Sequence, residues 1–215
     1  MKKTLNNINA KEAFSKSLKR ICSDLTENEL AYITSKVTIT ELKSKTIYLR
    51  AGIVQESIGF IFSGLLRSYY ISEDGKEITT AFLSENNTAT DYRSFIQQQP
   101  SKFYIKSLEP CVFVNLSYTS MQQCYHKFKN FEKYGRLIAE YLLIKRQNRI
   151  ESFLFENAEQ RYLNFIENYK SLQNRITLTH LSSFLGIERQ SLTRIRKNIL
   201  ITNIDTNVSE SDVLK

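Results

Sequence analysis

Three side chains near the C-terminal end of the sequence have the chemistry needed to read nucleic-acid bases. Arg189, Gln190 and Arg194 lie close together in a stretch with helical periodicity. Arginine and glutamine make paired hydrogen bonds to guanine and adenine edges in the major groove, and neighbouring cations bind phosphates. The chemistry that these residue types could support is therefore sequence-specific recognition of DNA.

The surrounding stretch, residues 177–198, has the pattern of two short helices joined by a tight turn. Apolar residues of the first helix recur at helical spacing, at Leu178, Leu181, Phe184 and Leu185. Thr177 can cap its first turn, and Gly186 can end it because glycine reaches positive φ without a Cβ penalty. A second apolar stripe follows at Ile187, Leu192 and Ile195. An ordinary helical hairpin with a solvated cationic face is the alternative interpretation.

The charge of the chain favours a polyanionic partner. Its 215 residues carry a formal net charge of +8 with a pI near 9.3, and this length allows one or two domains. The three cysteines, Cys22, Cys111 and Cys124, form no C-x-x-C pair, which predicts reduced and mostly buried thiols rather than disulfides or a zinc site. The sequence has neither a signal peptide pattern nor an apolar run of membrane-spanning length. We therefore expect a cytoplasmic protein without a membrane partner.

The middle of the sequence predicts an antiparallel β domain. Residues 10–34 have helical periodicity, with a capping box from Thr26 to Glu29 opening a second helix. Short β-branched or aromatic runs then cover 37–42, 46–49, 58–62, 65–71, 77–83, 103–108 and 112–116. Their number and spacing predict a jelly roll, and Asp74-Gly75 is the clearest hairpin turn. The polar insertion 91–100, with one expected helical turn, is either a functional loop or a solvated connection.

A long helix is predicted from about residue 130 to residue 156. Its apolar stripe is wider than one seam, so one side is expected to pack on its own β domain and another on a partner helix. The predicted dimer face comprises Phe131, Tyr134, Leu137, Ile138, Tyr141, Leu142, Lys145 and Asn148. A helix that packs only on its own domain is the alternative. A capping box from Asn157 to Gln160 opens the next helix, so the domains are predicted at 1–156 and 157–215.

The order of these elements resembles the Crp/Fnr family of bacterial transcription regulators over nearly the whole chain. The strongest local match runs from Ile176 to Ile195 through Leu185-Gly186-Ile187-Glu188-Arg189-Gln190, and 48–52 and 61–67 are similar to the family's barrel turns. The resemblance implies an α+β protein with an N-terminal double-stranded β-helix (jelly roll) sensor domain, a long dimerisation helix and a C-terminal winged-helix-like helix-turn-helix domain. The DNA contacts that it implies are Thr177, Thr179, Arg189, Gln190, Ser191, Thr193, Arg194, Arg196 and Lys197.

Within this set, the resemblance separates base readers from phosphate contacts. Arg189, Gln190 and Arg194 stand at the family's base-contacting positions, whereas Thr193, Arg196 and Lys197 are expected at phosphates. Glu188 departs from the family, because it replaces the small hydroxyl residue usual at the start of the recognition helix. That change removes a good cap and adds a negative charge near the DNA. The chain after Leu200 is short and polar, which predicts a reduced wing and a poorly ordered tail.

The segment that resembles a phosphate-binding cassette also departs from the family. Thr90-Asp91 and Ser101-Lys102 stand where cyclic-nucleotide binders have Gly-Glu and then Arg-Ser/Thr. The predicted effector pocket comprises Asp91, Tyr92, Arg93, Ser101 and Lys102. Asp91 can mimic a ribose-binding carboxylate, but Arg93 and Lys102 are imperfect substitutes for the missing arginine, since an ammonium does not grip phosphate as a guanidinium fork does. We therefore expect a degenerate pocket that does not bind cyclic AMP.

Other sensing and catalytic chemistries lack their residues. An iron–sulfur cluster needs about four cysteine ligands. Haem sensing needs a well-placed ligand, whereas His126 and His180 fit satisfied surface histidines. A jelly-roll metal enzyme needs clustered histidines on its strands. We therefore expect no metal, no cofactor and no enzymatic activity.

Together these features predict a homodimeric regulator that binds a pseudo-palindromic site on double-stranded DNA. RNA polymerase and an unidentified small-molecule effector are further expected partners. The alternative is a ligand-binding or protein-interaction module whose basic helix no longer reads specific DNA.

Overall fold

The computed structural model describes the backbone of residues 2–199 and the side chains of residues 6–199. The chain divides into two compact units, the first ending at Gln147 and the second starting at Asn148. The boundary predicted from the sequence lies after residue 156, where a new helix begins, whereas the compact units divide within the long helix before it. The predicted reduced wing and poorly ordered tail fall after residue 199, outside the described residues.

Two helices precede the β domain. α1 spans Lys2–Ile21 and α2 spans Glu27–Lys36. The predicted capping box opens α2, because Thr26 Oγ1 accepts from the Glu29 amide at 3.3 Å while Glu29 Oε2 accepts from the Thr26 amide at 2.7 Å. Local sequence therefore determines where the second helix begins.

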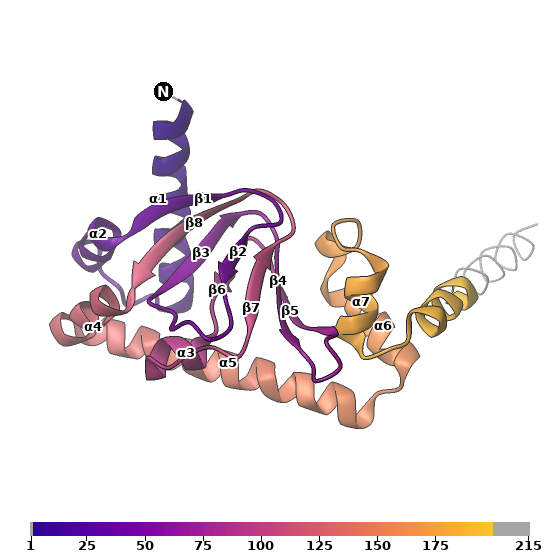
Figure 1. Ribbon diagram of the computed structural model, residues 1–215. Helices are drawn as coiled ribbons and strands as arrows, with labels where there is room; N and C mark the ends of the chain where they lie inside the picture. Colours follow the sequence, from indigo (N-terminus) through magenta and orange to yellow (C-terminus); the bar gives the residue numbers. More distant parts are fainter. Residues whose placement is uncertain (1, 200–215) are drawn as a thin grey trace, which may run out of the picture. The chain divides into compact units, whose positions relative to one another are not determined.

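The β domain is a sandwich of two four-stranded antiparallel sheets (Figure 1). Its strands are β1 (Thr38–Leu42), β2 (Ile47–Leu49), β3 (Ser57–Ser63), β4 (Leu66–Ile71), β5 (Glu77–Leu83), β6 (Thr88–Ala89), β7 (Tyr104–Ser107) and β8 (Cys111–Ser117). The sheet orders β1-β8-β3-β6 and β2-β7-β4-β5 are those of a jelly roll and confirm that prediction. Only β6 was not predicted, because two residues carry no periodic pattern.

The turns and the insertion follow the residues that specify them. Gly75 has a φ of 76° in the β4–β5 hairpin, where the Ser72 amide donates to Lys76 O at 2.9 Å. The insertion between β6 and β7 contains α3 (Tyr92–Gln97), in agreement with the expected helical turn.

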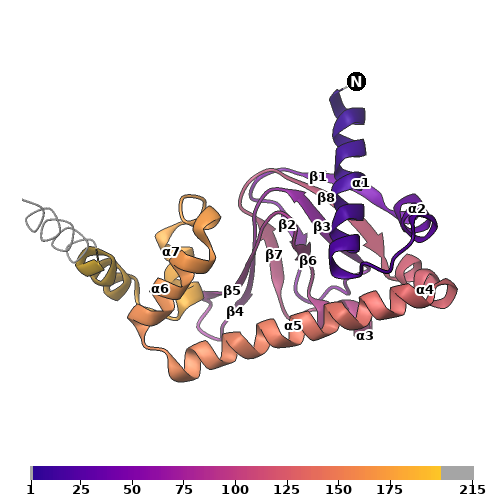
Figure 2. The same ribbon diagram turned by 180° about the vertical axis from the view of Figure 1, so that it is seen from behind.

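Two apolar clusters hold the N-terminal unit together. The space between the sheets is filled by Leu49, Ile61, Leu66, Ala89, Ile105, Cys111 and Phe113. The outer face of the first sheet contributes Phe60, Val114 and Leu116 to a second cluster with α1 and α2, and Figure 2 shows α1 crossing this sheet. The middle strands β3 and β8 are therefore buried on both faces, which explains their nearly continuous apolar runs.

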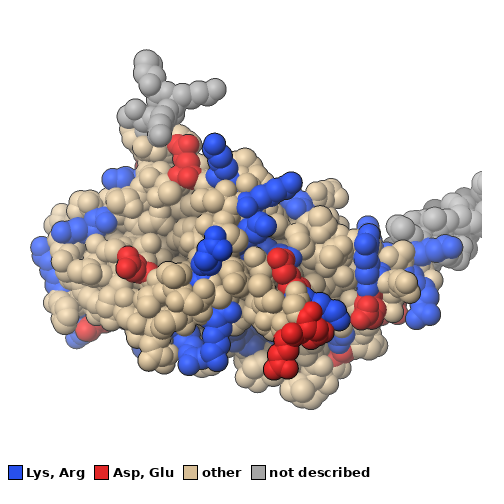
Figure 3. Space-filling view, viewed as in Figure 1, with Lys and Arg blue, Asp and Glu red and all other residues tan. Residues whose placement is uncertain are grey.

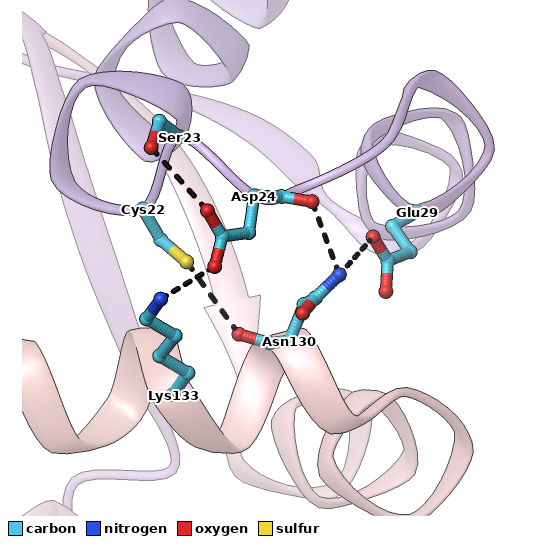
Figure 4. A network of polar contacts seen from close by, with 6 residues as sticks. All are labelled: Cys22, Ser23, Asp24, Glu29, Asn130 and Lys133. Carbon is cyan, nitrogen blue, oxygen red and sulfur yellow. Dashed lines mark hydrogen bonds and ion pairs between the residues drawn. The ribbon is translucent and has the colours of Figure 1, made fainter.

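After the sandwich, α4 (Tyr118–Lys127) leads into the long helix α5 (Lys129–Phe155). A polar network ties the first turn of α5 to the connection between α1 and α2 (Figure 4). The Asn130 side-chain amide donates to Asp24 O at 3.0 Å and to Glu29 Oε2 at 3.1 Å. Lys133 forms an ion pair with Asp24. The start of α5 is thus anchored within the N-terminal unit.

The C-terminal unit continues with α6 (Ala158–Asn168), the short 3-10 helix η1 (Lys170–Leu172) and α7 (Leu178–Leu185). A further helix covers residues 189–199, up to the end of the described range. None of the described helices is both long and apolar enough to cross a membrane. The three cysteines are free and buried, as predicted.

Candidate nucleic-acid interface and effector site

The helix–turn–helix hairpin has the caps expected from its sequence. Thr177 Oγ1 accepts from the His180 amide at 3.2 Å and caps α7. Gly186 ends α7 in the left-handed region at φ 63°, and its amide donates to the carbonyls of Ser182 and Ser183. The tight turn between the two helices therefore depends on a residue without a Cβ.

One face of each hairpin helix packs into the core of the C-terminal unit. The buried apolar residues of this unit are Tyr162, Phe165, Leu172, Leu181, Phe184, Leu185, Ile187 and Leu192. Phe184 meets Phe165 edge-on with ring centroids 5.9 Å apart. Both apolar stripes predicted from the sequence thus face inward, which fixes the direction of the opposite face.

The opposite face of the hairpin is free. The predicted DNA contacts Thr177, Thr179, Arg189, Gln190, Thr193, Arg194, Arg196 and Lys197 are exposed, and Ser191 is half-buried. Figure 3 shows blue Lys and Arg side chains around this end of the C-terminal unit. The Thr193 hydroxyl donates to Arg189 O at 2.9 Å, so its proton is used within the helix. The arrangement offers guanidinium and amide groups to bases and cations to phosphates.

Glu188 occupies the cap position of the second helix. Its carbonyl accepts the first intrahelical bond, from the Leu192 amide at 2.9 Å, and the side chain is exposed. A glutamate side chain caps less well than serine or threonine. The Glu188 carboxylate also places a negative charge next to Arg189, at the N-terminal end of the helix that is predicted to contact DNA.

The predicted effector residues are only partly brought together. The Ser101 hydroxyl donates to Asp91 Oδ2 at 2.7 Å, and both residues are buried. Tyr92 is half-buried, and this burial raises the pKa of its phenol. Arg93 is exposed and donates to Gln97 Oε1 at 3.1 Å, and Lys102 is also exposed. The two predicted cations therefore lie at the surface, whereas the carboxylate lies inside.

Gln55 completes this buried network and was missed by sequence reasoning. Its Oε1 accepts from the Asp91 amide at 2.7 Å, and its Nε2 donates to the Ser57 and Ala89 carbonyls at 2.9 and 3.2 Å. The Gln55 amide in turn donates to Ser94 Oγ at 3.1 Å. Donors that a phosphate-binding cassette would offer to an anion are thus used within the protein. A lone glutamine in a loop gives no sequence signal for this role.

The long helix α5 divides its apolar residues between two environments. Phe131 is 1% exposed and packs in the core that α1 and α2 cover, with Tyr134 and Leu137 against the same cluster. The burial of Phe131 removes it from the predicted dimer face, whereas Tyr134 and Leu137 are half-buried and their place on that face stays a prediction. Of the other predicted residues, Ile138 and Leu142 are half-buried, while Tyr141, Lys145 and Asn148 are exposed.

A different stripe of α5 is apolar and exposed. Leu143, Ile150 and Leu154 are 70%, 54% and 69% exposed. Their spacing of seven and four residues places them on one side of the helix, as in a coiled-coil seam. This stripe is an exposed apolar side of α5 that the predicted dimer face did not include.

Comparison with known proteins assigns the β domain. Residues 39–128 match the cyclic nucleotide-binding domain. The cAMP-activated global transcriptional regulator CRP of Pasteurella multocida is 21% identical over 180 residues, which cover 78% of this chain and 85% of that protein. Sequence similarity thus extends well beyond the matched domain.

Solved structures share the architecture. The c-di-GMP responsive global regulator CLP of Xanthomonas campestris superposes with a TM-score of 0.66 and 13% identity, covering 83% of this chain and 93% of that one. FixK2 of Bradyrhizobium japonicum gives a TM-score of 0.68 and 12% identity, covering 78% and 86% of the two chains. The chain is thus similar to Crp/Fnr-type transcription regulators in sequence and in fold over most of its length.

Two further residues of this chain were missed in the sequence. Arg149 and Arg161 donate to the last carbonyls of α7, at Phe184 O and Leu185 O. Nothing in the local pattern of the sequence marks either arginine for this role. The contact joins residues 35 positions apart, so periodicity carried no signal for it.

Proposed function

We propose that this chain is a homodimeric regulator of transcription that binds specific double-stranded DNA in the cytoplasm. One observation carries the proposal: an exposed basic face on a capped helix–turn–helix hairpin whose apolar faces are buried. Burial of the apolar faces leaves the basic face as the free surface. Similarity to a known transcription regulator and the net charge of +8 support the same function.

The proposed roles follow from side-chain chemistry. Arg189, Gln190 and Arg194 read base edges, because arginine and glutamine make paired bonds to guanine and adenine. Arg196 and Lys197 contact phosphates, which orient the protein without reading sequence. The remaining proposed backbone contacts come from the hydroxyls of Thr177, Thr179, Ser191 and Thr193.

The dimer is proposed to form along the exposed apolar stripe of α5. Leu143, Ile150 and Leu154 would lose most of their exposed area in a seam between two parallel copies of this helix. A twofold dimer would place two recognition helices about 34 Å apart, in successive major grooves of a pseudo-palindromic site.

We propose that cyclic AMP does not gate this regulator. The buried Asp91 carboxylate is satisfied by Ser101, and the Asp91 amide is used by Gln55. A phosphate would meet a buried negative charge there, with Arg93 and Lys102 at the surface. Calorimetry with cyclic AMP and cyclic GMP should give no binding heat, and micromolar binding would contradict this part.

Two further partners belong to the proposal. An effector of another class is proposed because the N-terminal unit has a sensor fold. RNA polymerase is proposed because a transcription regulator acts on that enzyme. No catalytic step is proposed for either unit.

The decisive experiment selects bound sites from genomic or random DNA. Wild-type protein should enrich a pseudo-palindromic sequence. Arg189→Ala should then cost about 1–3 kcal/mol on the selected site and blunt the base preference, whereas Lys197→Ala should weaken binding to all sequences alike. Equal affinity for every sequence would favour the alternative, a module that no longer reads DNA.

A further inference from the structure

A half-buried arginine joins the end of the long helix to the first helix of the hairpin. The Arg149 guanidinium lies close to two aromatic rings, 4.2 Å from the Phe153 centroid and 3.9 Å from the Phe184 centroid. Its Nη2 also donates to the carbonyl of Phe184, the second-last residue of α7. Two aromatic rings and one backbone carbonyl of the C-terminal unit thus engage this guanidinium.

A second arginine holds the next carbonyl of the same helix end. Arg161, on α6, donates from Nε to Leu185 O at 2.9 Å and from Nη1 to Glu156 O at 2.6 Å. Its guanidinium carbon lies 5.4 Å from the Phe153 centroid. Two cations therefore satisfy the last carbonyls of α7, where the helix dipole favours positive charge.

Phe153 also lies against the turn of the hairpin. A Cβ built on Gly186 would come within 2.7 Å of Phe153 Cε1. The glycine is therefore required twice, once for its positive φ and once for the closeness of this ring. The turn that aims the helix over 189–199 rests directly on the last two turns of α5.

Lysine at position 149 could not reproduce the contacts that Arg149 makes. A guanidinium stacks on aromatic rings and donates from a rigid planar fork, whereas an ammonium is a compact and strongly hydrated charge. Burial lowers the pKa of Arg149 to about 10, so the group still carries its charge at neutral pH.

The same turns of α5 also carry residues of the proposed dimer seam. Arg149 and Phe153 lie one turn apart on one side of the helix, where Phe153 keeps 47% of its surface exposed. Ile150 and Leu154 lie one turn apart on a neighbouring side and are 54% and 69% exposed. One short piece of helix thus contacts the hairpin on one side and offers apolar surface on another.

We propose that Arg149 and Phe153 are positioning residues that fix the recognition helix relative to the dimer seam and thereby set the half-site separation that the dimer accepts. This inference rests on the proposed DNA-binding function. The seam fixes each α5, and the contacts of Arg149 and Phe153 fix the hairpin on that helix. Loosening these contacts frees the hairpin while leaving its base-reading face intact.

The test uses DNA duplexes that carry two copies of the selected half-site. Their separation is either that of the selected site or one base pair longer or shorter. Each added base pair moves one half-site by about 3.4 Å and turns it by about 34°. The variants are Arg149→Lys, which keeps the charge, and Phe153→Leu, which keeps an apolar side chain. Arg146→Lys is the matched control, because Arg146 is an exposed arginine on the same helix.

The wild-type protein and Arg146→Lys should lose about tenfold in affinity when the separation changes by one base pair. For Arg149→Lys and Phe153→Leu the loss of affinity caused by the same change in separation should fall below about threefold. Their affinity for a duplex with a single half-site should stay within about twofold of wild type. The combination separates positioning from folding, because a misfolded hairpin would lose the single half-site as well.

Two results would overturn the inference. One is an unchanged separation preference in both variants. The other is a parallel loss of single-half-site binding, which would make these residues structural supports of the hairpin. If wild-type protein binds every sequence equally, the proposed function itself has failed, and that result is visible before any variant is made.

Discussion

The hydroxyl of Ser101 donates a 2.7 Å hydrogen bond to Oδ2 of Asp91 inside the N-terminal unit. Both side chains belong to the segment that resembles a phosphate-binding cassette, and both are buried. The pair uses up the polar groups that a ligand would need. A carboxylate held in this way also opposes the entry of a phosphate, since like charges repel strongly where water is excluded.

Ser101→Ala should therefore destabilise the N-terminal unit without opening a nucleotide site. Asp91 would lose a charge-assisted bond while remaining buried, at a cost of about 1–3 kcal/mol. Urea unfolding followed by circular dichroism measures the loss. Lys102→Ala is the control, because this neighbouring exposed side chain should change stability by less than about 0.5 kcal/mol. Equal stability of the two variants would mean that the Ser101 bond contributes nothing.

Glu29 should make folding stability depend on pH. Burial alone would raise the pKa of Glu29, but bonds from the Thr26 amide, the Asn130 side chain and the Thr26 hydroxyl hold it below its usual 4.5. The stabilisation is therefore fully present above pH 4.5 and is lost as the pH falls through the lowered pKa of the folded protein. Glu29→Gln should cost about 1.5–3 kcal/mol at pH 7 and much less in acid.

Glu27→Gln is the control for this pH dependence. Glu27 lies in the same first turn of α2 but is exposed. Its removal should leave the curve of unfolding free energy against pH close to that of the wild type. A Glu29→Gln curve parallel to the wild-type curve would contradict the assignment.

Local sequence predicted the features that depend on neighbours in the chain. Thr26, Asn157 and Thr177 cap helices where expected, and Gly186 ends α7, because caps involve residues only three or four positions apart. The jelly roll was predicted because each strand carries its own pattern and its own turn. The exposed recognition face followed from the same periodicity.

Contacts between distant segments could not be predicted in this way. The apolar stripe of α5 predicted that the helix is buried, but not that Phe131 would face its own domain while Leu143 stays exposed. Gln55 and Arg149 gave no signal, because their partners lie far away in the sequence. Periodicity predicts which side of a helix is apolar, but only the folded structure shows which segment packs against that side.

The stripe of α5 that forms the dimer can be identified by two matched substitutions. Ile150 is 54% exposed and Tyr141 is 55% exposed, but Ile150 lies on the free apolar stripe and Tyr141 on the face predicted from the sequence. Ile150→Glu should weaken the dimer at least about a hundredfold, because it would bury an unpaired charge in the seam. Tyr141→Glu should leave the dimer intact. Sedimentation equilibrium measures the dimer dissociation constant of each variant. If Tyr141→Glu weakened the dimer and Ile150→Glu did not, the dimer would form along the face predicted from the sequence.

Gly186→Ala should lower folding stability far more than Gly75→Ala, a substitution with a similar backbone strain. Gly75 has a similar φ, 76° against 63°, but a Cβ there meets open space. Gly75→Ala should cost about 1–2 kcal/mol from the left-handed conformation alone. Gly186→Ala adds a clash with the Phe153 ring and should cost clearly more. Hydrogen exchange of the unit that carries each glycine measures the loss of stability in each variant. Equal losses would mean that the Phe153 ring does not restrict the turn at Gly186.

Glu188 should lower affinity for all DNA sequences. Its carboxylate sits at the start of the proposed recognition helix, where serine or threonine would cap better and carry no charge. Glu188→Gln removes the charge alone and should tighten binding to specific and random DNA by a similar factor, with the gain shrinking as salt rises.

Glu188→Ser separates capping from charge at this position. It should match Glu188→Gln in affinity and in addition stabilise the C-terminal unit by about 0.5–1 kcal/mol through a new cap. Fluorescence anisotropy at several salt concentrations and thermal unfolding measure the two effects. If Glu188→Gln weakens binding to the selected site only, the carboxylate accepts from a base, and Glu188 is itself a reader rather than an electrostatic cost.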